Sequence, residues 1–203
     1  MNIEESQEFF DRAFRLHRAM AIFRGADEEA VAVLSRRAWT AGLVLVEVPL
    51  QSPQSERALR TAVAEATRYS AWAGVGAGTI TSVELVEKAG AAGAAFTVAP
   101  GFDPEVLTRS LELGMPHLPG VATPTEVQSA MKIGARWLKA FPADALGEAW
   151  FSGMRAPFPT VRFLATGGVT GENALRFLDA GAAAVSFGSS FAALTGPELD
   201  AVR

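Results

Sequence analysis

Short runs of apolar residues recur along the chain, and longer segments with apolar and polar positions at helical spacing separate them. The runs are too short for helices and predict eight buried strands, at Ala19–Phe23, Leu43–Val48, Trp72–Ala77, Ala94–Val98, Met115–Leu118, Trp137–Phe141, Arg162–Ala165 and Ala183–Phe187. The intervening segments predict helices, among them Glu28–Ala41, Ser55–Tyr69, Ser82–Ala89, Pro104–Leu113, Pro124–Ile133 and Glu172–Asp179. The amphipathic pattern over Ile3–His17 predicts an extra helix before the first strand.

The alternation of strands and helices is typical of a parallel sheet covered by helices. Several predicted helices end at a glycine that supplies a left-handed cap, as at Gly90, Gly134 and Gly181. An open doubly wound sheet is the alternative, but the first strand lacks the G-x-G-x-x-G turn of a dinucleotide-binding sheet. We therefore predict an α/β fold, a (β/α)8 TIM barrel, in one domain over residues 1–203, with the Ile3–His17 helix covering the N-terminal end.

Composition and charge exclude several classes of function. The net charge is −4 and there is no run rich in lysine or arginine, so nucleic acid is not an expected partner. The chain has no cysteine, which excludes disulfides, thiolate metal ligands and a cysteine nucleophile. No apolar stretch reaches the roughly 20 residues of a membrane span, and the acidic start lacks the pattern of a signal peptide. We expect a cytoplasmic protein.

Two charged residues interrupt otherwise apolar strands. Glu47 lies within Leu43–Val48 and Lys139 within Trp137–Phe141, and each precedes a proline by two or three residues. A buried charge is costly unless it is paired or functional. Counting strands puts the two residues on the second and sixth, which face each other across an eight-stranded barrel near the C-terminal mouth, where barrel enzymes carry their chemistry.

This pair of charges has a structural and a functional interpretation. The structural one is a buried ion pair kept for packing, which adds little net stability. In the functional one, burial helps a lysine to lose its proton, and the neutral amine attacks a ketone. A carboxylate beside it transfers protons. We favour the functional interpretation, with Lys139 and Glu47 as candidate catalytic residues.

Loops that contain glycine follow the seventh and eighth predicted strands, which is a common position for a barrel's phosphate site. Glycines let backbone N–H groups approach phosphate oxygens, and a helix that begins after the second loop adds a favourable dipole. Glycine also serves turns for purely conformational reasons, so the prediction depends on the two loops together. The candidate phosphate-binding residues are Gly167, Gly168, Gly188, Ser189 and Ser190, and Thr166, which precedes the first loop, is a further substrate-binding candidate whose hydroxyl is placed to bond one configuration of the sugar hydroxyl.

Three further candidates follow other strands at the same mouth. Arg24, after the first strand, carries a guanidinium that binds carboxylate or phosphate in a bidentate manner. Thr79, after the third strand, is either a ligand contact or a helix N-cap. Pro100, after the fourth strand, forms a turn and part of the pocket wall. His17 and His117 are isolated and show no metal-ligand spacing, so we expect neither a metal nor a cofactor.

Six ordered motifs lie between Ala19 and Phe191: Ala21-Ile22-Phe23-Arg24-Gly25, Val46-Glu47-Val48, Gly76-Ala77-Gly78-Thr79, Pro119-Gly120-Val121-Ala122-Thr123-Pro124-Thr125-Glu126, Leu138-Lys139-Ala140-Phe141-Pro142-Ala143 and Thr166-Gly167-Gly168-Val169. They resemble the motifs of bacterial 2-keto-3-deoxy-6-phosphogluconate (KDPG) and 4-hydroxy-2-oxoglutarate (KHG) aldolases and their 6-phosphogalactonate relatives. The resemblance implies a homotrimeric class I aldolase that cleaves KDPG to pyruvate and glyceraldehyde 3-phosphate. It implies a Schiff base on Lys139, proton transfer by Glu47 and binding of the pyruvyl carboxylate by Thr79, with phosphate on the two glycine loops.

The chain departs from the family pattern at positions that bear on the substrate. Pro49-Leu50-Gln51 replaces the Thr-x-Arg of many members and looks like the galactonate-type relatives, whereas Thr166 looks like the gluconate type. Ala140 and Asp144 also differ from the usual residues. The same chemistry on the galactonate epimer or on KHG therefore stays open. Two more distant alternatives are a phosphate-binding isomerase or decarboxylase barrel and a non-catalytic phospho-ligand binder.

Overall fold

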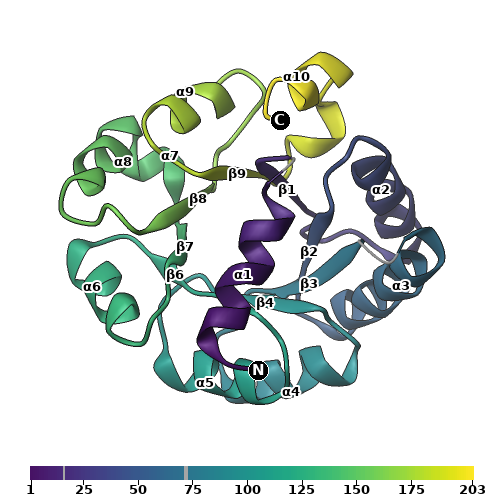
Figure 1. Cartoon of the computed structure of the whole chain (residues 1–203). Coiled ribbons are helices and arrows are strands. Elements are labelled where there is room, and N and C mark those ends of the chain that lie inside the picture. Colours follow the sequence, from purple (N-terminus) through teal and green to yellow (C-terminus); the bar gives the residue numbers. More distant parts are fainter. Residues whose placement is uncertain (16, 71–72) are drawn as a thin grey trace.

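A computed structural model of the chain describes residues 1–15, 17–70 and 73–203. Within these residues, nine parallel strands form a ring and the helices lie outside it, apart from α1 (Figure 1). The strands are β1 (Ala19–Ile22), β2 (Leu45–Pro49), β3 (Gly74–Gly78), β4 (Phe96–Val98), β5 (His117–Leu118), β6 (Gly120–Val121), β7 (Trp137–Ala140), β8 (Arg162–Thr166) and β9 (Ala184–Phe187).

The short strands β5 and β6 are two parts of the fifth barrel strand. Pro119 separates them, because proline has no N–H to donate to a neighbouring strand. β5 pairs with β4 and β6 pairs with β7, and the Lys139 N–H donates to the Pro119 carbonyl at 2.8 Å. The ring is continuous across Pro119, so the predicted (β/α)8 barrel is confirmed. The fifth strand extends past its predicted end at Leu118 to Val121.

Most helices lie between consecutive strands, as the sequence pattern predicts (Figure 1). The helices are α1 (Ile3–Ala13), α2 (Glu28–Thr40), α3 (Pro53–Tyr69), α4 (Val83–Ala91), α5 (Pro104–Glu112), α6 (Pro124–Lys132), α7 (Ala143–Leu146), α8 (Glu148–Arg155), α9 (Ala174–Asp179), the 3-10 helix η1 (Phe191–Ala193) and α10 (Gly196–Asp200). No helix in the described part of the chain has the length and apolar character needed to cross a bilayer.

Some element boundaries differ from the prediction for local reasons. The first helix ends at Ala13 instead of His17, and the turn that follows brings Phe14 beneath Trp137, with ring centroids 4.9 Å apart. The helix predicted from Glu172 begins at Ala174, because the Asn173 side chain accepts a hydrogen bond from the Thr170 N–H and closes a turn there. The third strand begins at Gly74, and Ala71 and Trp72 lie outside the described residues.

The apolar residues of the strands pack on two sides. Residues that face outward pack beneath the helices in the larger core cluster. Residues that face inward form a separate cluster with Phe10 and Phe14 of α1, and it includes Met20, Leu45, Phe96, Trp137 and Leu164. Helix α1, purple in Figure 1, lies across one opening of the ring and places its aromatic side chains in that opening.

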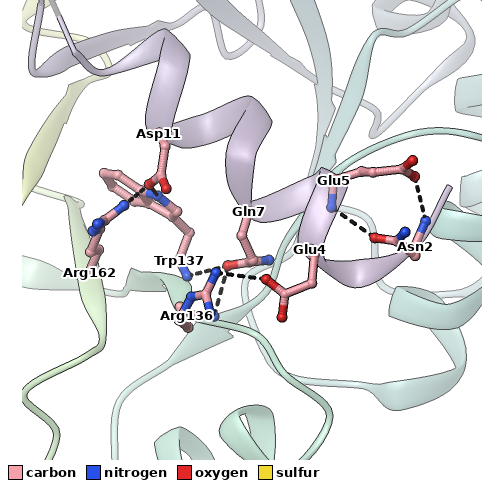
Figure 2. Close-up of polar contacts among 8 residues, drawn as sticks. All are labelled: Asn2, Glu4, Glu5, Gln7, Asp11, Arg136, Trp137 and Arg162. Carbon is pink, nitrogen blue, oxygen red and sulfur yellow. Dashed lines mark hydrogen bonds and ion pairs between the residues drawn. The ribbon is translucent and has the colours of Figure 1, made fainter.

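Polar contacts fix α1 against the N-terminal ends of β7 and β8 (Figure 2). The Gln7 side-chain carbonyl accepts hydrogen bonds from the backbone N–H groups of Arg136 and Trp137 at 2.8 and 2.7 Å. Asp11 accepts from the Trp137 indole N–H at 2.6 Å and forms an ion pair with Arg162. Because α1 closes the N-terminal opening, as predicted, the opposite end of the barrel is the one left for a binding site.

Candidate active site

Glu47 on β2 and Lys139 on β7 share one layer of the barrel interior. Each lies two residues beyond an inward-facing residue, Leu45 and Trp137 respectively, so their side chains point to the same interior. In an eight-stranded barrel of the usual stagger, the level rises by about one residue per strand. Following the paired residues around the ring with that rise puts four residues at one level, Glu47, Val98, Lys139 and Ser186.

Burial perturbs both charged residues of this layer. Glu47 is fully buried, and this raises the pKa of its carboxyl group, although the positive charges of Lys139 and Arg24 oppose the rise. Lys139 is also buried, and this lowers the pKa of its ammonium group. Arg24 adds to that effect, while Glu47 opposes it. Both shifts favour the neutral forms, a protonated acid and a nucleophilic amine.

Glu47 and Lys139 do not form an ion pair. No hydrogen bond or ion pair within 4.0 Å joins them, and neither carboxylate oxygen of Glu47 has a hydrogen-bond partner within residues 1–15, 17–70 and 73–203. Lys139 Nζ instead lies 5.0 Å from the centroid of the Phe141 ring. A buried carboxylate without a partner carries a large desolvation cost, which a packing role does not explain.

The third strand leaves room for the Glu47 carboxyl group. A Cβ atom placed on Gly78 would lie 1.9 Å from Glu47 Oε1, so a larger residue there would displace the carboxylate. The next residue, Thr79, has φ 59°, a left-handed conformation that a β-branched residue adopts only at a cost of roughly 1–3 kcal/mol. The N-cap of α4 is Ser82, whose side chain accepts from the Leu85 N–H, so the N-cap interpretation of Thr79 is wrong.

Arg24 lies at the mouth beside Gln51, one of the residues at which the sequence departs from the family pattern. Its guanidinium donates a hydrogen bond to the Gln51 side-chain carbonyl at 2.7 Å, and its charge acts on both Glu47 and Lys139. Arg24 also lines a cavity of about 260 Å³ together with Gly188 and Ser189. The structure therefore brings Arg24 next to the loop after β9.

The first glycine loop, after β8, has a backbone conformation that glycine favours. Gly167 and Gly168 have φ 98° and 69°, a conformation that an L-residue rarely adopts. The Ser190 hydroxyl donates to the Val169 carbonyl at 2.7 Å and connects the two loops. The helix expected after Ser190 is only the three-residue 3-10 helix η1, so its dipole adds little.

Pro100 lies half-buried after β4 and forms a close backbone contact with the fifth barrel strand. A Cβ atom on Gly120 would lie 2.2 Å from the Pro100 carbonyl carbon. Gly120 pairs with Lys139 in the β6–β7 ladder, so the Pro100 backbone lies beside the strand that flanks the lysine. That Pro100 forms part of the pocket wall stays a prediction.

Two residues near the site were not assigned a role from the sequence. Ser186 on β9 is buried, and its hydroxyl donates to the Thr166 hydroxyl at 2.7 Å. The sequence feature that could have identified Ser186 is that it is the single polar residue within the apolar run Ala183–Phe187. Asp144 places its carboxylate against the glycine loop, since a Cβ atom on Gly168 would lie 2.6 Å from Asp144 Oδ2.

Comparison with known proteins identifies the family of this chain. Residues 10–202 match the model of the family described as KDPG and KHG aldolase. The chain belongs to the KDPG and KHG aldolase family. As an aldolase of this family it is a carbon–carbon lyase, and its fold and its six sequence motifs agree with that membership.

Relatives of this aldolase differ in the sugar acid that their names give. The 2-dehydro-3-deoxy-6-phosphogalactonate aldolase of Escherichia coli K12 is 36% identical over 171 residues, which cover 84% of this chain and 82% of the relative. The 2-dehydro-3-deoxy-phosphogluconate aldolase of Treponema pallidum is 37% identical over 152 residues, covering 74% and 70%. "Dehydro" and "keto" denote the same oxidised C2. The family resemblance is confirmed, and the choice of epimer is not decided by it.

A solved structure adds a chemical observation about a relative. The KDPG aldolase of Legionella pneumophila, captured with pyruvate as a covalent carbinolamine intermediate, has 25% identity to this aldolase and a TM-score of 0.77. The match covers 94% of each chain. A carbinolamine is the adduct that an amine forms with a ketone before water leaves, so in that relative an amine attacks pyruvate.

Proposed function

We propose that this aldolase cleaves KDPG to pyruvate and glyceraldehyde 3-phosphate through a Schiff base on Lys139. The observation that carries the proposal is a buried lysine with a lowered pKa, in one layer with a buried glutamate that has no partner. The lysine supplies a nucleophilic amine, and the glutamate supplies an acid or base in a site shielded from water. The carbinolamine captured in the Legionella relative supports the same chemistry here.

In the proposed reaction, the neutral amine of Lys139 attacks the C2 ketone of the substrate to form a carbinolamine. Glu47, acting through a water, delivers the proton with which the C2 oxygen leaves as water, and an iminium remains. The Glu47 carboxylate then removes the proton from the C4 hydroxyl, and the C3–C4 electron pair moves toward the iminium as that bond breaks. Glyceraldehyde 3-phosphate departs, and protonation and hydrolysis of the remaining enamine release pyruvate and free Lys139.

Substrate binding is assigned to the loops at the C-terminal mouth. The Gly167–Gly168 loop and the loop formed by Gly188, Ser189 and Ser190 bind the phosphate through backbone N–H groups and the Ser189 hydroxyl. Thr79 and Arg24 bind the carboxylate next to C2, because each follows a strand that ends at this mouth. The reaction requires no cofactor and no metal.

The substrate has a second candidate, because two residues favour different epimers. Gln51, where many family members have arginine, favours the galactonate epimer. Thr166 favours the gluconate epimer, and we give it more weight because it is buried beside the proposed reacting centre. KHG is the third substrate to compare. We further propose a cytoplasmic homotrimer built from one barrel domain per chain.

Borohydride trapping with pyruvate tests the nucleophile. The chain has only three lysines, Lys88, Lys132 and Lys139, so peptide mass spectrometry locates an adduct without ambiguity. We expect a stable reduced adduct on Lys139, its loss in Lys139→Met, and normal labelling in the control Lys132→Met, which changes an exposed lysine on α6. Active protein that carries no adduct on Lys139 would disprove the Schiff-base mechanism. Values of kcat/KM for the three substrates then rank them.

A further inference from the structure

Ser186 is a polar residue on the interior face of β9 for which the proposed reaction has no role. Its side chain is 1% exposed, and Ala184, two residues earlier, belongs to the interior apolar cluster. Ser186 therefore points into the barrel, at the level of Glu47 and Lys139. A buried hydroxyl in the reactive layer requires an explanation, because valine or alanine would satisfy packing at this position.

The hydroxyl of Ser186 makes a directed hydrogen bond to Thr166. Ser186 Oγ donates to Thr166 Oγ1 at 2.7 Å, whereas the carbonyl of Ala165 is 3.4 Å away and offers a much weaker acceptor. A hydroxyl has one proton, so Thr166 accepts from Ser186 and keeps its own proton for another partner. Within the described part of the chain, Thr166 Oγ1 takes part in a hydrogen bond only as this acceptor.

Thr166 lies between the two ends of the proposed substrate. It lies two residues beyond Leu164, which pairs with Lys139, and it immediately precedes the Gly167–Gly168 loop. A substrate with C2 at Lys139 and phosphate at this loop passes Thr166 with its middle carbons. The carbon whose configuration distinguishes the gluconate and galactonate compounds is C4, which is also the carbon whose hydroxyl proton the reaction removes.

From these contacts we infer that Ser186 is a positioning residue that makes Thr166 a hydrogen-bond donor to the C4 oxygen of the substrate and thereby sets the preference between C4 epimers. The inference rests on the proposed function. When Thr166 donates to the C4 oxygen, the proton of the C4 hydroxyl remains directed at Glu47. The wrong epimer turns its C4 oxygen away and leaves a buried donor without a partner, which discriminates by about ten- to a hundredfold.

Kinetics of the two epimers test this role. In Ser186→Ala, Thr166 is free to rotate its hydroxyl, so we expect the ratio of the kcat/KM values for the two epimers to fall by about tenfold. Pyruvate trapping on Lys139 should be unchanged, because pyruvate has no C4. Thr166→Val should lose the same preference, and the double variant should lose no more than either single variant, since the two residues act as one unit.

Ser35→Ala is the matched control. Ser35 is equally buried, and its hydroxyl has no partner within the described residues, so its removal should leave the epimer ratio unchanged. A ratio that survives Ser186→Ala but is lost in Thr166→Val overturns the role of Ser186, and so does a ratio near one in the unmodified protein. If pyruvate is still trapped normally on Lys139 in those cases, the proposed Schiff-base function is not contradicted. Absence of the adduct from the unmodified protein overturns both proposals.

Discussion

Replacing Glu47 by glutamine separates the proposed catalytic role of this residue from its effect on stability. The carboxyl group is fully buried, and neither oxygen has a hydrogen-bond partner in the described chain. Burial without pairing raises its pKa, and the charges of Lys139 and Arg24 offset only part of that rise. Glu47→Gln keeps the shape of the side chain, removes the ionisable group and substitutes an amide that is less costly to bury.

We expect opposite effects on stability and activity. Near neutral pH, the variant should unfold with a free energy about 1–3 kcal/mol larger. For a chain of this size this corresponds to a rise in Tm of roughly 2–12 °C. The kcat should fall by about 10²–10⁴-fold, because proton transfer by Glu47 is lost.

The dependence of stability on pH gives a second measurement on the same variant. A raised carboxyl pKa means that the folded protein retains a proton in a pH range where the unfolded chain has released it. The stability of the unmodified protein should therefore fall as pH rises from the ordinary glutamate value of 4.5 through the raised folded-state pKa. Glu47→Gln should lack this component of the slope.

Thermal unfolding at several pH values and coupled assays of pyruvate release measure these quantities. Glu29→Gln, at an exposed position on α2, is the control and should change stability by no more than about 0.5 kcal/mol. A variant of Glu47 that is less stable than the unmodified protein and retains full activity would refute the reasoning. It would show that the carboxylate is a structural ion-pair partner instead of a catalytic group.

Two further predictions concern the helix that closes the barrel and the reactive lysine. Gln7→Ala should remove the acceptor for two backbone N–H groups, one of them on Trp137, and lower the free energy of unfolding by about 2–4 kcal/mol, measured in urea, with kcat unchanged. Borohydride trapping on Lys139 should rise with pH to a half-point below 10.5, since burial favours the neutral amine. In Glu47→Gln this half-point should move lower still, because the carboxylate raises the lysine pKa. An unchanged half-point in that variant would contradict the coupling.

The sequence alone determined the architecture and singled out the two residues of the proposed reactive pair. Short apolar runs separated by amphipathic helices specify a parallel barrel, because strands covered on both faces contain almost no polar residues. For the same reason a charge inside such a run is conspicuous, and Glu47 and Lys139 were found from that contrast. The six ordered motifs were sufficient to recognise the family, which the comparison then confirmed.

Only the tertiary structure decided which residues lie close together and which contacts their side chains make. A strand that is apolar on both faces gives no alternation from which to read its inward side, so the inward position of Ser186 and its bond to Thr166 could not be predicted. The separation of Glu47 from Lys139 likewise depends on strand register and on the space left by Gly78. These are properties of non-local pairing, and local sequence patterns do not encode them.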